Sequence, residues 1–160
     1  MTALAEVIRP GLLTTLQDFG RGGSRHLGVP LSGAADPYSL ALANASVGNE
    51  PVAAALECTL QGPSLRFLAP AAVALGGADM KARLNGEAVP LYQLVAIKDG
   101  DELALGAAEA GARCYIAIAG GIAGRAFLGS VSTYAPAALG GVEGRALKAG
   151  DRLTGAGERT

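Results

Sequence analysis

One stretch near the start of the chain concentrates polar side chains of the types that bind or activate small substrates. It runs from Pro10 to Asn49 and reads PGLLTTLQDFGRGGSRHLGVPLSGAADPYSLALANASVGN. Its polar members are Gln17, Asp18, Arg21, Ser24, Arg25, His26, Ser32 and Asp36. Glycines interrupt the run, and a Gly-rich polar loop on a rigid scaffold is a common form of functional segment.

Three of these residues are candidates for catalysis. His26 is the only histidine, and an unperturbed imidazole titrates near neutral pH, so it would serve as a general acid or base. A loop histidine bonded only to backbone is the alternative. Asp18 and Arg21 lie three residues apart and predict an ion pair that fixes the loop, with the remaining donors of Arg21 offered to a substrate carboxylate.

Four neighbours are candidates for substrate binding. Gln17 carries both a donor and an acceptor for an amide or ureido group, and Arg25 adds a second forked donor for an anion. The Ser32-Gly33 turn displays a hydroxyl, and its backbone N–H groups lie just before a predicted helix N-terminus, a combination that binds anions. GVPLSGA is not a GxSxG elbow and no second histidine exists for a triad, so we do not predict a serine nucleophile.

Further polar groups follow predicted strands downstream. Asp79 lies in GGADM, where backbone amides would approach a ligand, and Ser130, Ser132 and Thr133 lie in SVSTY, where hydroxyls would donate to an oxyanion. For each hydroxyl taken singly, a Ser/Thr turn is the alternative. Gly120-Gly121 follows another predicted strand. The combination of three separate Gly- or Ser-rich loops, each at a strand end, favours a functional role.

The elements that must position these residues are short strands and one good helix. Asp36 as N-cap, Pro37 at the first position and Gly48-Asn49 at the end predict a helix over 37–47. Asn85-Gly86 and Asp99-Gly100 predict hairpins that join 82–84 to 87–89 and 91–97 to 102–105. We expect a mostly-β barrel with a minor helical component. A loop is predicted over 123–144, and a last hairpin joins 145–148 to 152–153. Further strands are predicted over 4–8, 12–16, 55–60, 64–67, 72–75 and 112–119, and the strand over 112–119 is expected to be central.

One short pattern occurs twice along the chain. The residues Lys-x-Gly-Asp-x-Leu begin at Lys98 and again at Lys148. Because no third copy exists, we interpret the pattern as a repeated tight turn followed by a strand, and not as a repeat architecture.

Composition excludes several classes of protein. The 160 residues suit one domain, and their net charge of −1 lacks the basic stripe of a nucleic-acid binder. No apolar run is long enough to span a bilayer and no secretory signal is evident, so we expect a cytoplasmic protein without membrane contact. Cys58 and Cys114 are predicted to be buried free thiols. Because the sequence contains a single histidine, we expect no metal site. Neither GxGxxG nor a Walker A sequence occurs, so the chain alone shows no ATP-binding motif.

Several long motifs along the chain follow the order of a known family. They are PGLLTTLQDFGRGG, HLGVPLSGAADPYSLALAN, VGNEPVAAALE, GPSLRF, GGADM, AIAGGI and LGSVSTY. On these motifs the chain resembles the allophanate hydrolase subunit 2 family, also called KipA-like, the C subunit of 5-oxoprolinase, or the biotin-dependent carboxyltransferase domain of urea amidolyase. Two departures stand out: members are about twice as long, and Val131 stands where many relatives carry arginine.

The resemblance implies a cyclophilin-like β-barrel, with residues 1–160 as one domain and the first half of a two-domain member. It implies a subunit of an ATP-dependent amide hydrolase, of 5-oxoprolinase or allophanate hydrolase type, acting with a subunit 1 or KipI-like partner that handles ATP. The alternatives are the carboxyltransferase domain of a biotin-dependent urea carboxylase, a KipA-like regulatory binding protein, and a truncated domain that keeps the fold without activity. Biotin would visit on another domain, because Met80-Lys81 is followed by Ala82 and no Met-Lys-Met attachment motif occurs.

Overall fold

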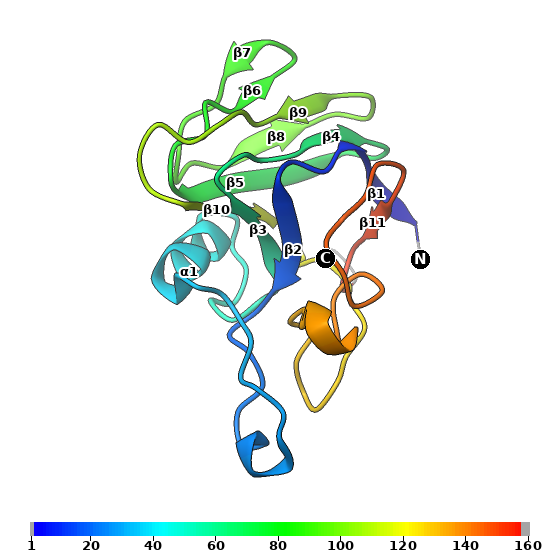
Figure 1. The fold of residues 1–160 in the computed structure, drawn as a ribbon. Helices are drawn as coiled ribbons and strands as arrows, with labels where there is room; N and C mark the ends of the chain where they lie inside the picture. The colour runs from blue at the N-terminus through cyan, green and yellow to red at the C-terminus, as the bar shows by residue number, and fades with distance from the viewer. Residues whose placement is uncertain (1, 158–160) are drawn as a thin grey trace.

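The chain folds into two antiparallel β-sheets that enclose one main core, with a single α-helix outside them (Figure 1). The structure is a computed structural model that describes residues 2–157. The six-stranded sheet has the order β11-β1-β4-β9-β6-β7, and the five-stranded sheet has the order β2-β3-β10-β5-β8. The predicted mostly-β fold with one main helix is confirmed.

The strand bounds agree with most of the expected ones. The six-stranded sheet holds β1 (Ala3–Arg9), β4 (Ser64–Phe67), β6 (Arg83–Leu84), β7 (Glu87–Ala88), β9 (Glu102–Ala104) and β11 (Arg152–Thr154). The five-stranded sheet holds β2 (Leu13–Gln17), β3 (Ala55–Thr59), β5 (Ala71–Gly77), β8 (Val95–Ile97) and β10 (Arg113–Ile118). Two 3-10 helices, η1 (Arg25–Leu27) and η2 (Ala135–Ala137), lie in loops, and η2 is the only helix within residues 123–144. The predicted central position of 112–119 is confirmed, because β10 lies between β3 and β5.

Alternation along the strands separates the core from the outer face of the five-stranded sheet. On β3, Leu56 and Cys58 are buried in the main core, whereas Glu57 points to the other face. Cys58 lies opposite Cys114 of β10, and both thiols are free and fully buried. Burial raises the pKa of both thiols, that of Cys114 to about 12 with a contribution from the charge of Asp79, so neither is a reactive thiolate.

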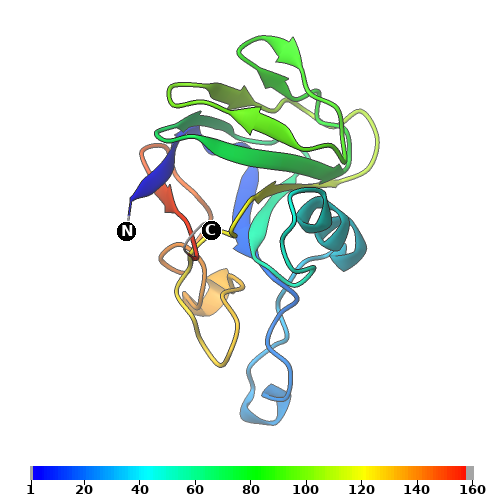
Figure 2. The same ribbon diagram turned by 180° about the vertical axis from the view of Figure 1, so that it is seen from behind.

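The helix α1 (Pro37–Ser46) lies against the outer face of that sheet, over β5 and β10 (Figure 2). Its predicted N-cap is confirmed, because Asp36 Oδ1 accepts a hydrogen bond from Ser39 N at 3.1 Å. The helix approaches closely at Gly76, where a Cβ atom would come within 2.8 Å of the carbonyl oxygen of Ser39. A side chain at Gly76 would therefore lift the first turn of α1 from the sheet.

The repeated Lys-x-Gly-Asp pattern forms the same turn twice. In each copy the aspartate accepts a 2.8 Å hydrogen bond from the lysine N–H, at Asp101 from Lys98 and at Asp151 from Lys148. The glycine N–H then donates to the neighbouring strand, to Phe67 O of β4 in the first copy and to Val7 O of β1 in the second. Because β1 and β4 pair side by side, the two turns lie in equivalent positions on either side of this pair.

Two hairpins predicted at these turns do not form: one was to join 91–97 to 102–105, and the other 145–148 to 152–153. β8 pairs with β5 in one sheet, and β9 pairs with β4 and β6 in the other, so the Asp99-Gly100 turn carries the chain between sheets. Residues 145–148 form no strand, and β11 pairs instead with β1. In both cases the tight turn forms as predicted, but hydrogen bonds to distant strands override the local pairing. The Asn85-Gly86 hairpin, β6 with β7, is confirmed.

The second of the two turns predicts a pH-dependent contribution to stability. Arg145 Nη1 and Nη2 lie 2.7 and 2.9 Å from the Asp151 carboxylate, and this ion pair, against the opposing effect of burial, lowers the pKa of Asp151. Asp151→Asn should lower the free energy of unfolding at pH 7 by about 1–2 kcal/mol. Because the folded pKa is depressed, this stabilisation is complete above the unfolded value of about 3.9 and is lost as pH falls through the folded pKa.

The matched control is Asp101→Asn, which removes the same carboxylate from a turn without an arginine partner. Urea denaturation at pH 7 and pH 3 checks the prediction. Equal destabilisation by the two substitutions would show that the arginine pair contributes nothing beyond the turn itself.

Candidate functional site

Residues 18–34, which lie within the polar stretch singled out in the sequence, form a projecting segment that we call the arm. Its two sides are held together by hydrogen bonds from Arg21 N to Leu31 O at 2.7 Å and from Ala34 N to Asp18 O at 2.9 Å. The sides cross so closely that a Cβ atom on Gly20 would lie 2.5 Å from Leu31 O. In Figures 1 and 2 the arm extends away from both sheets, with η1 at its far end.

Asp18 fastens the base of the arm to a distant loop. Its carboxylate accepts hydrogen bonds from Ser130 Oγ and Ser132 Oγ, both at 2.6 Å, and from the backbone N–H groups of Gly20 and Val131 at 2.7 and 3.0 Å. Partial burial alone would raise the pKa of Asp18, but these four donors outweigh it and lower the pKa. Asp18 is therefore an ionised structural acceptor in this conformation.

Arg21 is bound to the same loop and not to Asp18. Its side chain is 1% exposed; Nε donates to Phe127 O at 3.1 Å, and Nη2 donates to Ser132 O at 2.6 Å and Ser130 O at 3.4 Å. The guanidinium carbon also lies 5.8 Å from the ring centroid of Phe127. Only Nη1 lacks a hydrogen-bond partner among the described residues. The ion pair predicted with Asp18 is absent among the interactions described for residues 2–157.

The hydroxyls proposed for an oxyanion are already engaged. Ser130 and Ser132 each donate their single proton to Asp18, and Thr133 Oγ1 donates to Leu16 O at 2.9 Å. Gln17 Nε2 donates to Thr15 Oγ1 and Thr133 O, and its buried Oε1 has no hydrogen-bond partner within residues 2–157. Together these contacts form a clasp between the base of the arm and the loop at 127–133.

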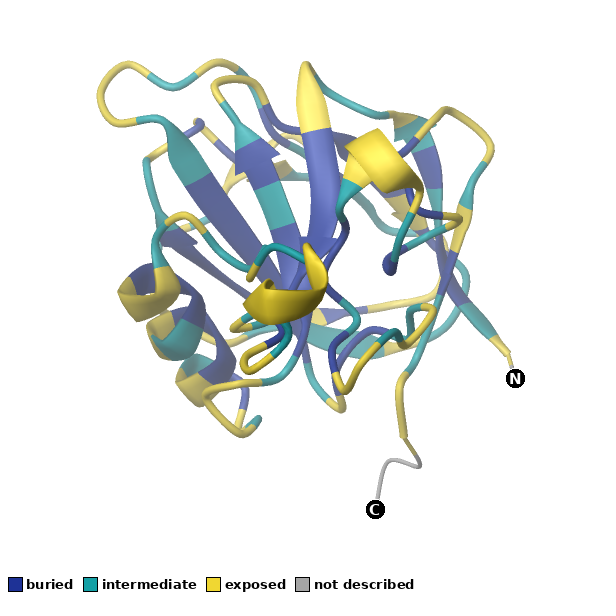
Figure 3. Cartoon of the chain, turned by 60° about the horizontal axis from the view of Figure 1, so that its bottom comes forward, coloured by how far each residue is buried: buried dark blue, intermediate teal, exposed yellow. Residues whose placement is uncertain are grey.

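The remaining arm residues lie away from this clasp. Arg25 and His26 are exposed on η1, in a molecule whose exposed residues are yellow in Figure 3. Their side chains form no hydrogen bond or ion pair with the rest of residues 2–157. Ser32 takes a positive φ of 53°, and its buried Oγ has no hydrogen-bond partner among the residues that the structure describes. The structure thus separates His26 from Asp18 and Arg21 along the length of the arm.

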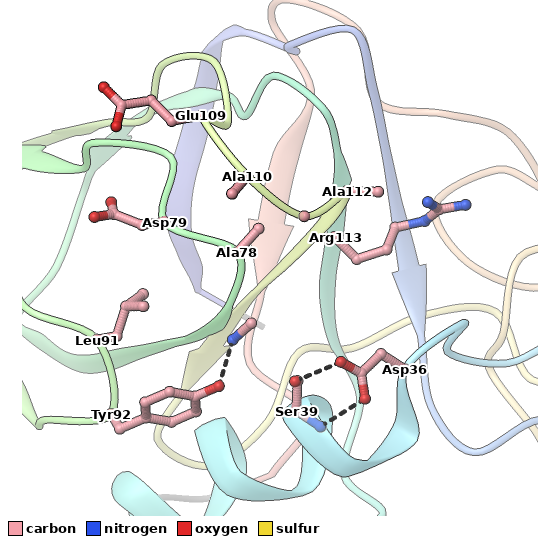
Figure 4. A pocket seen from close by; sticks show the side chains of 12 residues that line it. Asp36, Ser39, Ala78, Asp79, Leu91, Tyr92, Glu109, Ala110, Ala112 and Arg113 are labelled. Atoms are coloured by element: carbon pink, nitrogen blue, oxygen red, sulfur yellow. Dashed lines mark hydrogen bonds between the residues drawn. The ribbon is translucent and has the colours of Figure 1, made fainter.

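A cleft of about 710 Å³ opens on the other side of the arm's base, beside the first turn of α1 (Figure 4). Among the residues taken from the sequence as candidates, Asp79 lines it; the full lining is Asp36, Ser39, Gly77, Ala78, Asp79, Leu91, Tyr92, Glu109, Ala110, Gly111, Ala112 and Arg113. Figure 4 shows Asp79 and Glu109 on one side, with Asp36 and Arg113 on the other. Its volume lies in the range of small-molecule sites.

Polar groups behind the cleft join the arm to the five-stranded sheet. Tyr115 Oη donates to Glu57 Oε2 at 2.7 Å and accepts from Asp36 N at 2.9 Å, while Ala35 N donates to the same Glu57 oxygen at 2.8 Å. Burial and this carboxylate contact raise the pKa of Tyr115 well above its ordinary value, so the phenol stays protonated. Arg113 Nε lies 3.8 Å from Glu57 Oε1.

The cleft offers two unlike ends for a ligand. At one end the Asp79 and Glu109 carboxylates form ion pairs with exposed Lys81 Nζ at 3.7 and 3.3 Å, and Asp79 Oδ1 accepts a hydrogen bond from Lys81 N at 2.8 Å. Their remaining lone pairs can accept hydrogen bonds from a ligand. At the other end Arg113 is a cation, and its Nη atoms make no hydrogen bond with the described residues. Between them Tyr92 Oη accepts from Gly77 N at 2.8 Å, which leaves the phenolic proton for a ligand carbonyl. Residues 2–157 contain no group of three or more metal-ligating side chains.

Sequence reasoning missed most of this cleft. Glu57, Tyr115 and Arg113 lie on paired strands β3 and β10, where register and not proximity in sequence brings them together. The available signal was a tyrosine and an arginine inside an otherwise apolar strand. Tyr92 and Glu109 lie in loops without any pattern that marks them.

Comparison with known proteins identifies the family. A family model described as "Carboxyltransferase domain, subdomain A and B" matches residues 27–160. Urea amidolyase of Lachancea kluyveri is 44% identical over 149 residues, which make up 92% of this chain and 8% of that protein. The C subunit of 5-oxoprolinase from Escherichia coli is 43% identical over 150 residues, or 94% of this chain and 48% of that protein.

Solved structures show the same likeness. The crystal structure of the K. lactis urea amidolyase has a TM-score of 0.93 at 42% sequence identity, covering 96% of this chain and 9% of that chain. A crystal structure of TTHA0988 has a TM-score of 0.90 at 36% identity, covering 98% of this chain and 58% of that chain.

Fold and sequence together define a carboxyltransferase-type domain. The chain belongs to the carboxyltransferase domain family, subdomains A and B, which confirms the resemblance to urea amidolyase and to the C subunit of 5-oxoprolinase. It spans about half the length of the second of these relatives and less than a tenth of the first. Over residues 2–157, the structure has no helix with the length and apolar character needed to cross a bilayer.

The Asp18 clasp yields a prediction for stability. Asp18→Asn replaces a carboxylate that accepts four hydrogen bonds with an amide whose NH₂ group cannot accept any, so it should destabilise the fold by about 2–3 kcal/mol at pH 7. The pKa of Asp18 is lowered by folding, so the difference from wild type is full above about pH 3.9 and shrinks as pH falls through the folded pKa.

Urea denaturation between pH 2.5 and 7 measures this difference, with exposed Asp99→Asn as the control. A loss of stability that stays the same at every pH would contradict the role of the ionised carboxylate.

Proposed function

We propose that this chain is the ligand-binding part of a subunit of an ATP-dependent amide hydrolase, of 5-oxoprolinase or allophanate hydrolase type. The proposal rests on one observation, the two unlike ends of the cleft. A small amide or ureido acid carries a carboxylate at one end and N–H donors at the other. Arg113 matches the carboxylate, and the carboxylates of Asp79 and Glu109 match the N–H groups.

In this arrangement each lining group has a role in holding the ligand. Arg113 binds the carboxylate, and the free proton of Tyr92 Oη is directed to the amide or ureido carbonyl. Glu57 and Tyr115 hold the cleft wall in shape, because they connect β3 and β10 to the first residues of α1. Polarising the carbonyl in this way favours addition of water to the carbonyl carbon of the activated ligand, after which the carbon–nitrogen bond breaks and the nitrogen leaves with a proton from the water.

ATP is assigned to a partner subunit of the subunit 1 or KipI type. The cleft carries the carboxylates Asp36, Asp79 and Glu109 against a single lining arginine, which disfavours a triphosphate, and the sequence lacks a phosphate-binding loop. The described domain would be the first of two similar domains in such a subunit. The identity of 43% with the C subunit of 5-oxoprolinase, of which this chain covers 48%, supports this assignment.

The likeness to urea amidolyase favours a second candidate, the carboxyltransferase domain of a biotin-dependent urea carboxylase. The neutral ureido ring of biotin fits a cleft with apolar walls at Ala78 and Leu91 and a donor at Tyr92. Biotin, carried by another domain, would deliver a carboxyl group there, and Tyr92 and Arg113 would hold the acceptor. A KipA-like regulatory role remains the alternative from a different class, since it needs partner binding and no turnover.

The decisive experiment measures ligand binding and ADP release. We expect 5-oxoproline or allophanate to bind the chain in titration calorimetry and to stimulate ADP release when the subunit 1-type partner and ATP are present. Arg113→Ala should weaken binding of the stimulating acid by about 10- to 100-fold, because one charged hydrogen-bonding partner is lost.

Arg66→Ala is the matched control, since Arg66 is an exposed arginine of β4 paired with Glu102 outside the cleft. Stimulation by urea with a biotin-bearing partner, and by neither acid, would transfer the assignment to the carboxyltransferase candidate. Binding of the partner without turnover of any of the three substrates would leave the regulatory role.

A further inference from the structure

Arg113 is placed at the cleft by its strand, but its guanidinium is poorly satisfied there. It is the first residue of β10, and its side chain is 35% exposed. Its Nε is buried and makes no hydrogen bond with the described residues. The single ion pair of this side chain within residues 2–157 joins Nε to Glu57 Oε1 at 3.8 Å, beyond hydrogen-bond range. Because a guanidinium usually binds a carboxylate at about 2.7–2.9 Å through two N–H groups, most of the binding capacity of Arg113 is unused.

Glu57 is held much more firmly than its arginine partner. Its side chain is only 11% exposed. Its Oε2 accepts hydrogen bonds from Tyr115 Oη at 2.7 Å and from Ala35 N at 2.8 Å, and Tyr115 Oη in turn accepts from Asp36 N at 2.9 Å. These contacts fix the carboxylate to β10 and to the residues just before α1. Its negative charge therefore stays in place when the guanidinium of Arg113 turns to a ligand.

No other carboxylate within residues 2–157 pairs with Arg113. Asp36 lies on the same side of the cleft (Figure 4), but its two oxygens accept hydrogen bonds from Ser39, one from N at 3.1 Å and the other from Oγ at 2.5 Å. The two carboxylates on the opposite side form ion pairs with a lysine. Glu57 is therefore the charge with which an entering anion has to share Arg113.

We propose that Glu57 is a positioning residue that competes with the ligand carboxylate for Arg113 and thereby limits how tightly the cleft holds an acid. This inference rests on the proposed function, in which Arg113 binds the carboxylate of a small amide or ureido acid. A ligand carboxylate that makes short, charge-assisted hydrogen bonds displaces the longer contact to Glu57, because that contact includes no hydrogen bond. The bound acid then lies beside a second, fixed negative charge, and the repulsion between the two weakens binding.

The competition predicts which ligands respond to the charge of Glu57. An acid has to displace the contact between Glu57 and Arg113, so its affinity depends on that charge. A neutral amide of the same shape has no group for Arg113 and leaves the ion pair intact, so its affinity does not. 5-Oxoproline and 2-pyrrolidone form a matched pair of this kind, because they share the lactam ring and differ only in the carboxylate.

Titration calorimetry of Glu57→Gln with these two ligands tests the proposal. Glutamine keeps one oxygen that accepts from Tyr115 Oη and Ala35 N but removes the negative charge. We expect 5-oxoproline to bind about 3- to 10-fold more tightly than to wild type, and 2-pyrrolidone to bind equally well. Weaker or unchanged binding of 5-oxoproline would overturn the competition, since a purely structural role of Glu57 predicts a loss of affinity and never a gain.

Two further variants separate charge from structure. Glu57→Ala also removes the acceptor for Tyr115 and Ala35, so it should lower stability and weaken the binding of both ligands, and Glu57→Gln should restore them. Glu102→Gln is the matched control, because Glu102 pairs with Arg66 at the same distance of 3.8 Å outside the cleft. It should leave the affinity for 5-oxoproline unchanged, and a gain equal to that of Glu57→Gln would contradict a local competition.

A second measurement keeps this inference apart from the proposed function. The heteronuclear NMR signal of the Arg113 Nε–H group, assigned by its absence in Arg113→Ala, reports an anion at the guanidinium, and acetate serves as the probe. Glu57→Gln should lower the acetate concentration for half of the shift by about 3- to 10-fold. This result together with no binding of 5-oxoproline or allophanate would refute the proposed function alone. Acid binding through Arg113 without any tightening in Glu57→Gln would refute the competition alone.

Discussion

The Asp18 carboxylate is the contact on which the outer architecture of this domain depends. It accepts hydrogen bonds from the nearby Gly20 N–H and from three donors more than a hundred residues away in sequence, namely the hydroxyls of Ser130 and Ser132 and the Val131 N–H. Arg21 adds three hydrogen bonds to carbonyls of the same loop, so charges of both signs find partners in residues 127–132. The clasp acts together with the packing of Val131 on the core and the hydrogen bond from Thr133 N to Leu16 O to fix the loop at 127–133 against the base of the arm.

This arrangement explains why the polar side chains of Asp18 and Arg21 do not line the cleft. Buried charges are stable only when they are hydrogen-bonded, and the residues that meet this demand at Asp18 and Arg21 have few donors left for a ligand. The cleft instead draws its charged groups from strand ends and loops, which remain partly exposed. The arm and the cleft adjoin at Asp36, which follows the arm in sequence, caps α1 and lines the cleft.

Local chemistry predicted much of the fold. The cap at Asp36, the Asn85-Gly86 turn, the alternation of β3 and the central apolar β10 each depend on neighbouring residues, and each was readable. The strands that pair with β8 and β11 could not be predicted from local sequence, because each of these two strands lies beside a well-formed turn and yet pairs with a strand from another part of the chain. The same limit applies to the site: Asp18, Ser130 and Ser132 were each singled out as polar candidates, but their hydrogen bonds to one another were not predicted. The meeting of Glu57, Tyr115 and Asp36 depends on a register that sequence alone does not give.

The pairing of β1 with β11 has a consequence for how the protein is made. β1 leaves the ribosome long before β11, so one of its edges stays open until residues 152–154 have been synthesised. During that interval the edge presents unpaired backbone groups to other chains, which is a known route to aggregation. Its partner β4 covers only the opposite edge. Slow translation between β1 and β11 would lengthen this exposure, so the yield of folded protein should be sensitive to chaperones that hold exposed strands.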